Sequence, residues 1–388
     1  MSDQVIGAVR DLLPALRERA QQAEDRRRLP EESIKDLDRA GLFRLLQPAR
    51  FGGHEADPLT FYTAVRLVAS ACGSTGWVGS VVGVHPWQLA LFPEQAQQDV
   101  WGPDPDTRIS SSYAPTGKAR LVAGGYQLSG RWSFSSGCDH ASWVFLGGIV
   151  TDESGNPVDF CTFLLPREDY AIEDVWDTVG LRGTGSNDIL VRDAFVPAHR
   201  ALSFADTSKC VCPGQEVNPG PLYRLPFGAV FSYTITTPII GMATGAYEAH
   251  VAYMTERVRV SFKGEKSKED PYAKVRIAEA ASEIDAAWLQ LKDNMEQLVR
   301  HAVAGERIPL SLRLRVRRDQ VRGTGRCIQA IDRLFENSGG RALRVGTPIQ
   351  RFWRDAHAGR VHAINDPERA LNMFGTGEFG LPVQDAML

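Results

Sequence analysis

The stretch Phe335–Ala370, FENSGGRALRVGTPIQRFWRDAHAGRVHAINDPERA, gathers more ionisable side chains around a glycine-rich turn than any other part of the chain. Ser338, Gly339 and Gly340 predict the end of one helix, because glycine readily adopts the backbone conformation that closes a helix. The residues after this turn predict a second helix that begins near Pro348. We therefore expect a functional site close to the C-terminus.

Three residues of the second predicted helix fall on one face. Asp355, Gly359 and His362 are spaced i, i+4 and i+7. Glycine has no side chain, so this spacing predicts a hollow between a carboxylate and an imidazole. Arg351 lies four residues before Asp355, and we expect the two to form an ion pair that holds the helix in place.

Composition bounds the class of protein. The chain has 388 residues, a formal net charge of −3, 23% charged residues and 43% hydrophobic residues. These values indicate a globular protein of two or three domains and argue against nucleic-acid binding. The sequence has no apolar run long enough to span a membrane and no secretory signal at its acidic, amphipathic start. Six scattered cysteines indicate reduced thiols, so we expect a cytoplasmic protein without a metal site.

Hydrophobic periodicity divides the chain into an all-α, an all-β and a second all-α part. Residues 1–105 predict a helical domain, residues 106–205 a β-barrel or β-sandwich, and residues 227–388 a four-helix bundle. Residues 206–226 have no periodicity and predict a surface excursion. The absence of strand–helix alternation excludes the doubly wound and (β/α)8 folds, which leaves an α+β multidomain protein.

Smaller patterns refine this outline. Ile277 to Leu298 carry apolar residues at heptad spacing, which predicts packing along a neighbouring helix. Residues 179–196 predict two strands, joined by Gly183 to Ser186. The arginines between residues 313 and 326 predict a solvated or subunit-facing surface.

Two runs of hydroxyl side chains lie beside aromatic residues in the predicted β domain, at residues 110–113 and 133–137. Such runs are often merely solvated. Alternatively, they form a polar wall that bonds the edge of a flat heteroaromatic ring, while the aromatic residues pack on its faces. Among the eight histidines, His362 and His85 stand out by context, because a neutral imidazole can exchange a proton with a phenol.

The α–β–α order, together with GLRGTGSNDIL at residues 180–190 and PIQRFWRDAHAGRVHA at residues 348–363, resembles the acyl-CoA dehydrogenase superfamily over essentially the whole chain. Dehydrogenases of this fold carry an acidic base within a YEGT-like segment. Here His362 occupies the tyrosine position and Ala363 the acidic position. The substrate base of a dehydrogenase is therefore missing from its expected place.

In this departure the chain resembles the two-component flavin-dependent aromatic monooxygenases of the same fold. Three further motifs carry the same resemblance: ACGSTGWV (residues 71–78), RISSSYAP (residues 108–115) and WSFSSGCDHASW (residues 132–143). The resemblance implies a homotetramer built on the C-terminal bundle. It also implies a separate NADH-dependent reductase that supplies reduced flavin, FMNH2 or possibly FADH2. With O2 as co-substrate, the enzyme would hydroxylate a phenolic seco-steroid ortho to its hydroxyl through a C4a-hydroperoxyflavin.

The resemblance also implies residue roles. The catalytic residues would be His362, Ser136, Ser111 and His85. Ser136 would bond flavin N5, His362 would sit near the reacting oxygen, and the other two would line the substrate side. The flavin contacts would be Trp77, Ser111, Ser112, Tyr113, Phe134, Ser135, Ser136, Arg257, Ser338, Gly339, Gly340, His362 and Ala363.

Two other interpretations stay open from the sequence. One is an acyl-CoA dehydrogenase or nitroalkane-oxidase type of flavoenzyme, which would hold oxidised FAD tightly. The other is a non-catalytic oligomer that binds flavin without reacting. Flavin type, FMN or FAD, is equally open, because both share the ring and the first phosphate.

Overall fold

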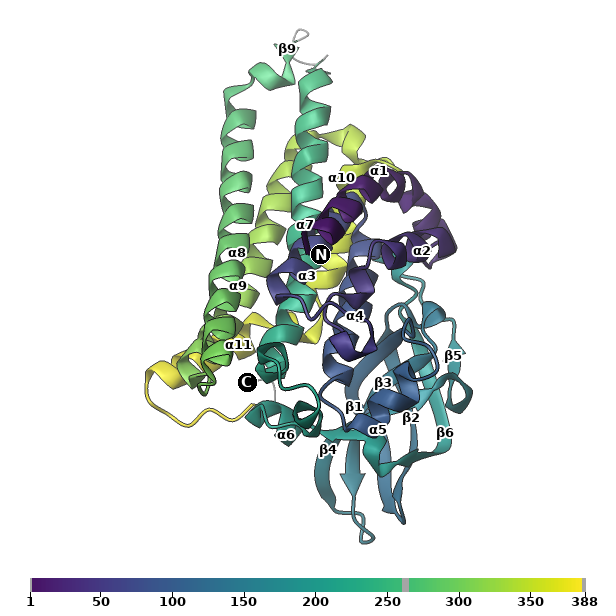
Figure 1. The fold of residues 1–388 in the computed structure, drawn as a ribbon. Helices are drawn as coiled ribbons and strands as arrows, with labels where there is room; N and C mark the ends of the chain where they lie inside the picture. The colour runs from purple at the N-terminus through teal and green to yellow at the C-terminus, as the bar shows by residue number, and fades with distance from the viewer. Residues whose placement is uncertain (1, 260–264, 386–388) are drawn as a thin grey trace.

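The computed structural model describes residues 2–259 and 265–385, and its α–β–α order confirms the predicted fold class (Figure 1). The N-terminal helices are α1 (Ser2–Arg26), α2 (Glu31–Arg39), α3 (Pro58–Ala71), α4 (Gly73–Leu89) and α5 (Glu94–Trp101). Of the N-terminal helices, α3 and α4 lie between the long helices of the bundle and the β domain (Figure 1). The domain boundaries themselves stay a prediction.

The strands of the central part join into one seven-stranded sheet with the order β5-β6-β2-β1-β3-β4-β7. β1 pairs antiparallel with β2 and parallel with β3. The prediction of two strands over residues 179–196 was wrong: β6 covers only the second half, and a buried 3-10 turn precedes it. The strands are β1 (Ile109–Val122), β2 (Gly125–Ser135), β3 (Trp143–Thr151), β4 (Pro157–Pro166), β5 (Ala171–Glu173), β6 (Asn187–Pro197) and β7 (Ala201–Ser203).

Long helices form the C-terminal part. α8 packs along α9, as the heptad pattern predicted, and buries Ile284, Leu291 and Leu298. The prediction of a solvated or subunit-facing arginine surface was wrong at Arg317. This side chain is buried and donates to the Ile364 carbonyl at 3.1 Å. The helices are α6 (Phe204–Lys209), α7 (Phe227–Glu256), α8 (Pro271–Ala304), α9 (Leu310–Ser338), α10 (Pro348–Arg360) and α11 (Pro367–Glu378), beside a short ribbon of β8 (Val258–Arg259) and β9 (Glu265–Lys266).

Helix α4 lies at the centre of the molecule, and all of its residues are buried. It is apolar around its whole circumference and carries no acidic or basic side chain apart from His85, as expected of a helix with neighbours on every side. Those neighbours include α3, α7, α10 and β1. Because α4 touches both the sheet and the bundle, it positions residues between the two.

The segment 206–226 is not the surface excursion that its composition predicted. It folds into the end of α6 and two 3-10 turns, and it buries Leu222 and Tyr223. The indole of Trp87 on α4 donates to the Leu222 carbonyl at 2.9 Å. The sequence did not indicate this packing, because the segment is rich in proline and glycine and its buried residues follow no regular repeat.

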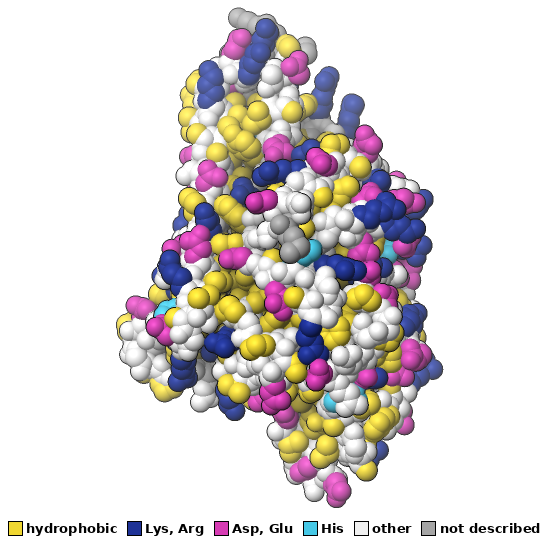
Figure 2. Space-filling view, viewed as in Figure 1, with side chains coloured by type: hydrophobic (Ala, Val, Ile, Leu, Met, Phe, Trp, Pro, Cys, Tyr) yellow, Lys and Arg dark blue, Asp and Glu magenta, His cyan; other side chains and the backbone are white. Residues whose placement is uncertain are grey.

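Positive and negative side chains are interspersed over the face in Figure 2, as the small net charge suggests. Among the helices of residues 2–259 and 265–385, none has the length and apolar character needed to cross a membrane.

Candidate active site

A cluster of hydroxyl and aromatic side chains lies where α4, the sheet and α10 meet. The Trp77 indole nitrogen, Nε1, donates to Ser136 Oγ at 3.2 Å, and Ser136 Oγ lies 2.7 Å from Ser186 Oγ. The Trp77 ring lies 6.0 Å from the His362 ring, and the Phe231 ring lies 6.4 Å from it on another side. The structure thus brings together Ser136, Trp77 and His362, three of the predicted site residues.

His362 lies after α10 rather than on it, because α10 ends at Arg360. The predicted shared helix face was therefore wrong. Nδ1 of His362 accepts the Ile364 backbone N–H at 3.2 Å, and the side chain thereby caps a short 3-10 turn. Burial, reinforced by nearby Arg317, lowers the pKa of His362 to about 4. The imidazole is neutral at pH 7, and because Nδ1 is an acceptor, Nε2 carries the proton.

Gly359 does not leave a hollow. A methyl group at this position would lie 2.8 Å from the Trp77 ring and 3.3 Å from Ile239. The indole fills the space that the sequence predicted to be empty. Glycine is required here because it lets α10 approach α4 closely enough for Trp77 to reach Ser136.

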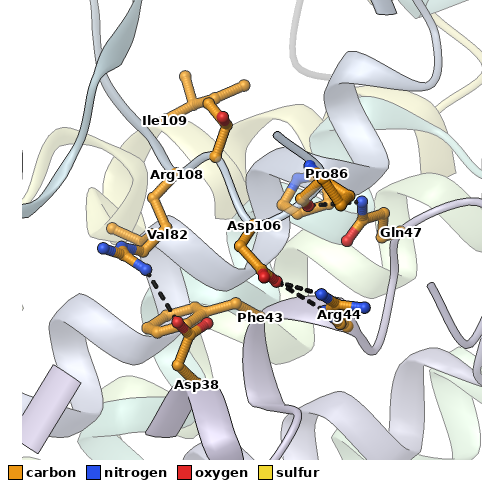
Figure 3. A pocket seen from close by; sticks show the side chains of 11 residues that line it. Asp38, Phe43, Arg44, Gln47, Val82, Pro86, Asp106, Arg108 and Ile109 are labelled. Atoms are coloured by element: carbon orange, nitrogen blue, oxygen red, sulfur yellow. Dashed lines mark hydrogen bonds and ion pairs between the residues drawn. The ribbon is translucent and has the colours of Figure 1, made fainter. Parts of the chain in front are cut away.

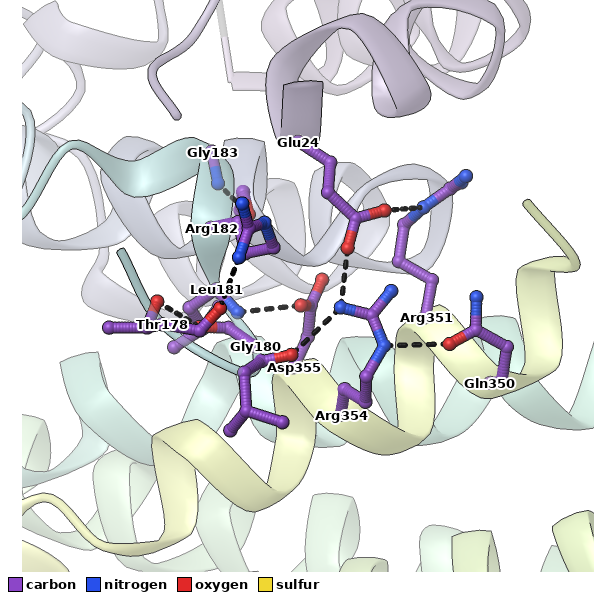
Figure 4. Close-up of polar contacts among 12 residues, drawn as sticks. Glu24, Thr178, Gly180, Leu181, Arg182, Gly183, Gln350, Arg351, Arg354 and Asp355 are labelled. Carbon is purple, nitrogen blue, oxygen red and sulfur yellow. Dashed lines mark hydrogen bonds and ion pairs between the residues drawn. The ribbon is translucent and has the colours of Figure 1, made fainter. Parts of the chain in front are cut away.

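Asp355 does not pair with Arg351, which corrects the predicted ion pair. Its carboxylate accepts the backbone N–H of Leu181 at 2.6 Å, while Arg351 and Arg354 both bind Glu24 of α1 (Figure 4). Burial raises the pKa of Asp355 to about 6. Asp355 thus fastens the turn before β6 to α10.

His85 and Ser111 form a second polar pair on the sheet side of α4. His85 Nδ1 lies 2.5 Å from the Ile109 carbonyl, to which it can only donate, and Nε2 lies 2.9 Å from Ser111 Oγ. Nε2 is therefore the acceptor of the Ser111 proton. Burial lowers the pKa of His85 to about 4. His85 and His362 consequently hold opposite neutral tautomers.

The wall behind His85 is closed. Ile109 and two ion pairs line a pocket of only about 10 Å³, with room for about one water. Figure 3 shows these side chains. Arg108 binds Asp38 at 3.1 Å, and Arg44 binds Asp106. This pocket is too small for a ring-sized ligand.

The other hydroxyls of the two runs mostly hold the strands together. Ser112 Oγ donates to the Ser133 carbonyl at 2.7 Å, and Ser135 Oγ donates to Ser110 Oγ at 3.2 Å. These bonds occupy the protons of Ser112 and Ser135, so the predicted flavin contacts of these two residues lack direct support.

Aromatic side chains wall the cluster. Tyr113 donates its hydroxyl to Gln88 and packs edge-on against Phe231 at 5.0 Å. Phe134 is 68% exposed, has a positive φ of 71° and meets the edge of Trp176 at 6.1 Å. An exposed aromatic side chain in a strained conformation beside Ser135 and Ser136 fits a residue that packs on a bound ring.

Arg257, Ser338, Gly339 and Gly340 lie together at the far end of α7. Arg257 donates to the Asn337 carbonyl at 2.9 Å. Gly339 has a φ of +68°, and a methyl group there would lie 2.5 Å from the Arg257 guanidinium. Nearby, His250 Nδ1 bonds Ser338 Oγ at 2.8 Å, while its buried Nε2 has no partner among the described residues. A guanidinium beside a glycine turn suits an anionic group such as a phosphate.

The two groups of predicted residues lie at opposite ends of one helix. Phe231 is in the first turns of α7, and Arg257 directly follows its end. Ile239, which lies with the Trp77 ring against Gly359, is 18 residues before Arg257, so at 1.5 Å per residue the two groups are roughly 27–39 Å apart along the helix. One copy of the chain therefore cannot apply both groups to one flavin ring and its first phosphate.

Sequence reasoning missed four residues of the site: Ser186, Thr184, Phe231 and Trp176. Ser186 and Thr184 lie in the GTGS segment, which was interpreted from the sequence only as the join between two predicted strands. Its hydroxyls beside Gly183 and Gly185 were the available signal. Nothing local marks Phe231, because it belongs to an apolar helix that is buried throughout its first half.

Comparison with known proteins extends these observations. Residues 3–104 match the acyl-CoA dehydrogenase N-terminal domain family, and residues 233–367 match the corresponding C-terminal domain family. The chain is 63% identical to the flavin-dependent monooxygenase oxygenase subunit HsaA of Rhodococcus jostii, covering 97% of this chain and 98% of that one. It is 58% identical to HsaA of Mycobacterium tuberculosis, covering 99% and 97% of the two chains.

Solved structures agree. The 3-HSA hydroxylase from Rhodococcus sp. RHA1 superposes with a TM-score of 0.96 at 61% identity, covering 99% of each chain. XiaF from Streptomyces, solved with FADH2, gives a TM-score of 0.91 at 27% identity, covering 98% of this chain and 96% of that one. The protein therefore belongs to the oxygenase subunits of flavin-dependent monooxygenases, a family of enzymes built on the acyl-CoA dehydrogenase fold.

Proposed function

We propose that this oxygenase hydroxylates a phenolic seco-steroid ortho to its hydroxyl group, with reduced flavin and O2, in steroid degradation. The substrate class rests on similarity to a 3-HSA hydroxylase at 61% identity. In such a reaction one oxygen atom enters the ring and the other leaves as water, while the reduced flavin becomes oxidised. Bound reduced flavin would supply the two electrons and carry the activated oxygen.

The observation that carries the proposal is the neutral His362 beside Trp77, whose indole in turn bonds Ser136. With Nδ1 committed to Ile364, His362 offers an Nε2–H donor. It would hold the phenol oxygen and stabilise negative charge on it, rather than remove its proton as the sequence alone suggested. A carboxylate at Ala363, as in a dehydrogenase, would repel that charge.

Ser111 and His85 would line the substrate side. Because the Ser111 proton is committed to His85 Nε2, the Ser111 oxygen presents an acceptor to a phenol hydroxyl. In the proposed site, His362 would supply a donor to the phenol oxygen and Ser111 an acceptor. Trp77, Tyr113 and Phe231 would exclude water, on which efficient oxygen transfer depends.

The flavin would be held by two copies of the chain. Ser136 and Phe134 of one copy would meet the ring, with backbone or side-chain groups of Ser111, Ser112, Tyr113, Ser135 and Ala363 around it. Arg257 with Ser338, Gly339 and Gly340 of another copy would receive the phosphate. The separation of roughly 27–39 Å along α7 supports this division.

Exposed apolar side chains support a homotetramer built on the C-terminal part. Val345, Val361 and Phe379 are 82–84% exposed in the single chain, and all lie after α9. Such residues are typical of a surface covered by another copy. We further propose a cytoplasmic location and a separate NADH-dependent reductase, which would deliver FMNH2 or FADH2. The designation of the relatives as oxygenase subunits supports a partner of this kind.

Reconstitution tests the proposal. The purified chain is mixed anaerobically with chemically reduced FMN or FADH2 and a phenolic seco-steroid, and O2 is then admitted. We expect a catechol that carries one atom from 18O2, detected by mass spectrometry. Release of hydrogen peroxide alone would overturn the proposal. Bleaching of bound oxidised FAD by an acyl-CoA would instead favour the dehydrogenase interpretation.

A further inference from the structure

We infer that Ser186 and Thr184 are positioning residues that turn the Ser136 hydroxyl proton away from the flavin, so that the site accepts an N–H and thereby selects reduced over oxidised flavin. This inference rests on the proposed function, in which Ser136 faces flavin N5. It adds two residues and a cause for redox selection. It follows from counting the protons in one buried row of hydroxyl groups.

The row begins at a carbonyl. Thr184 Oγ1 lies 2.9 Å from the Leu181 carbonyl oxygen, and a carbonyl can only accept, so the single Thr184 hydroxyl proton points there. Thr184 Oγ1 also lies 2.6 Å from Ser186 Oγ. Since the Thr184 proton is already used, Ser186 must be the donor in this second contact.

The same reasoning fixes the next contact. Ser186 Oγ lies 2.7 Å from Ser136 Oγ, and Ser186 has donated its proton to Thr184. Ser136 must therefore donate to Ser186. The Trp77 Nε1–H donates to Ser136 at 3.2 Å, and indole nitrogen is a donor only. Ser136 thus has no proton left for a ligand and presents a lone pair.

The carbonyl that starts the row is held in place. Leu181 adopts a left-handed conformation with φ of 51°, and its N–H is bound by the buried Asp355 carboxylate at 2.6 Å. Its carbonyl also accepts the Trp176 indole N–H at 2.8 Å. The Gly137 N–H donates to the Thr184 carbonyl at 2.9 Å, which ties this turn to the backbone next to Ser136. The row is therefore preorganised before any ligand binds.

The chemistry of flavin completes the inference. N5 of reduced flavin carries a hydrogen, whereas N5 of oxidised flavin is a bare acceptor. A lone pair on Ser136 Oγ can accept the N5–H of reduced flavin but repels the lone pair on N5 of oxidised flavin. A protein that receives reduced flavin from a reductase and must release the oxidised product gains from this difference. A single neutral hydrogen bond corresponds to about a three- to tenfold difference in affinity.

The test measures flavin affinity rather than turnover. Dissociation constants of oxidised FMN, and of reduced FMN without oxygen, are determined by fluorescence for the full-length protein. Ser186→Ala removes the acceptor of the Ser136 proton, so that Ser136 can donate to oxidised N5. We expect oxidised FMN to bind three- to tenfold more tightly relative to reduced FMN. Thr184→Val should shift the ratio in the same direction, while Thr184→Ser, which keeps the hydroxyl, should not.

Two controls separate the N5 contact from general loosening. Ser80→Ala deletes a buried hydroxyl that donates to the Thr234 carbonyl, outside the row and outside the proposed site, and should leave the ratio unchanged. Oxidised 5-deazaflavin has a C–H in place of N5 and should gain no affinity in Ser186→Ala. An unchanged ratio in both Ser186→Ala and Thr184→Val, or an equal gain for 5-deazaflavin, would overturn the inference. If the wild-type protein still forms catechol in that case, the proposed function stands; if it never binds reduced flavin, both fall.

Discussion

The two ends of α7 present opposite chemistry. Along its first half, Ser136, Trp77 and His362 form a neutral cluster inside the fold, enclosed by aromatic rings. At its far end, Arg257 and Gly339 place a guanidinium beside an open glycine turn. The first environment suits an uncharged ring at which oxygen is transferred, and the second an anion. Under the proposed function, reaction and anchoring would be separated within one chain, and oligomerisation would reunite them.

The largest effect should come from the first end, because it is also part of the core. Trp77 is 5% exposed and contacts α10 through Gly359. Trp77→Ala should lower the free energy of unfolding by about 3–5 kcal/mol. Chemical denaturation checks this value, with the half-exposed Leu121→Ala as the control, for which about 1 kcal/mol or less is expected. Equal losses in the two variants would refute the core role of Trp77.

Acid should weaken the same end through His85. Its pKa is about 4 in the folded state, below the ordinary value near 6.5, so between these values the unfolded chain binds more protons. Stability therefore falls as pH falls from about 6.5 to 4. His85→Gln removes this titrating group, so its free energy of unfolding should decrease by about 2–3 kcal/mol less than that of wild type over this pH range.

The measurement is the free energy of unfolding across that pH range. Asp355 acts in the opposite direction, because its pKa is raised to about 6 and its protonation favours the folded state as pH falls from 6 to 4. The Asp355→Asn variant should therefore steepen the acid dependence that His85→Gln flattens. The same slope in both variants would contradict the assignment.

At the far end, Arg257→Ala should leave stability within about 1 kcal/mol of wild type but reduce the affinity for reduced FMN about ten- to hundredfold. The reason is the loss of a charge-assisted contact to phosphate. Lumiflavin, which has the ring but no phosphate, is the matched ligand control. It should bind the wild-type protein and Arg257→Ala equally. A comparable loss of lumiflavin affinity would place Arg257 at the ring instead.

The smallest effect concerns the connection between α10 and the turn before β6. Asp355→Asn keeps an oxygen that can accept the Leu181 N–H, so it should cost about 1 kcal/mol or less at pH 7. Asp355→Ala leaves that buried N–H without a partner and should cost about 1–3 kcal/mol. Denaturation midpoints of the two variants compare them directly. An identical cost would mean that the hydrogen bond contributes nothing.

Most of the fold was predictable, because long helices and alternating strands leave periodic patterns in the sequence. The heptad seam that buries Ile284 and Leu291 is one example. The segment 206–226 was not predictable, since its burial of Leu222 depends on α4, which is distant in sequence. In the site, the resemblance named Ser136 and His362, and the structure places both beside Trp77. It could not reveal that Trp77 fills the space at Gly359 or that Ser186 holds the Ser136 proton.

The most direct test of the central claim is the product yield of a single turnover in His362→Ala. Reduced FMN is bound without oxygen, O2 and the phenolic seco-steroid are added, and catechol and hydrogen peroxide are counted per flavin. We predict that wild type converts most of the reduced flavin into catechol. His362→Ala should still bind reduced FMN but release mainly peroxide. A full catechol yield in His362→Ala would contradict the account.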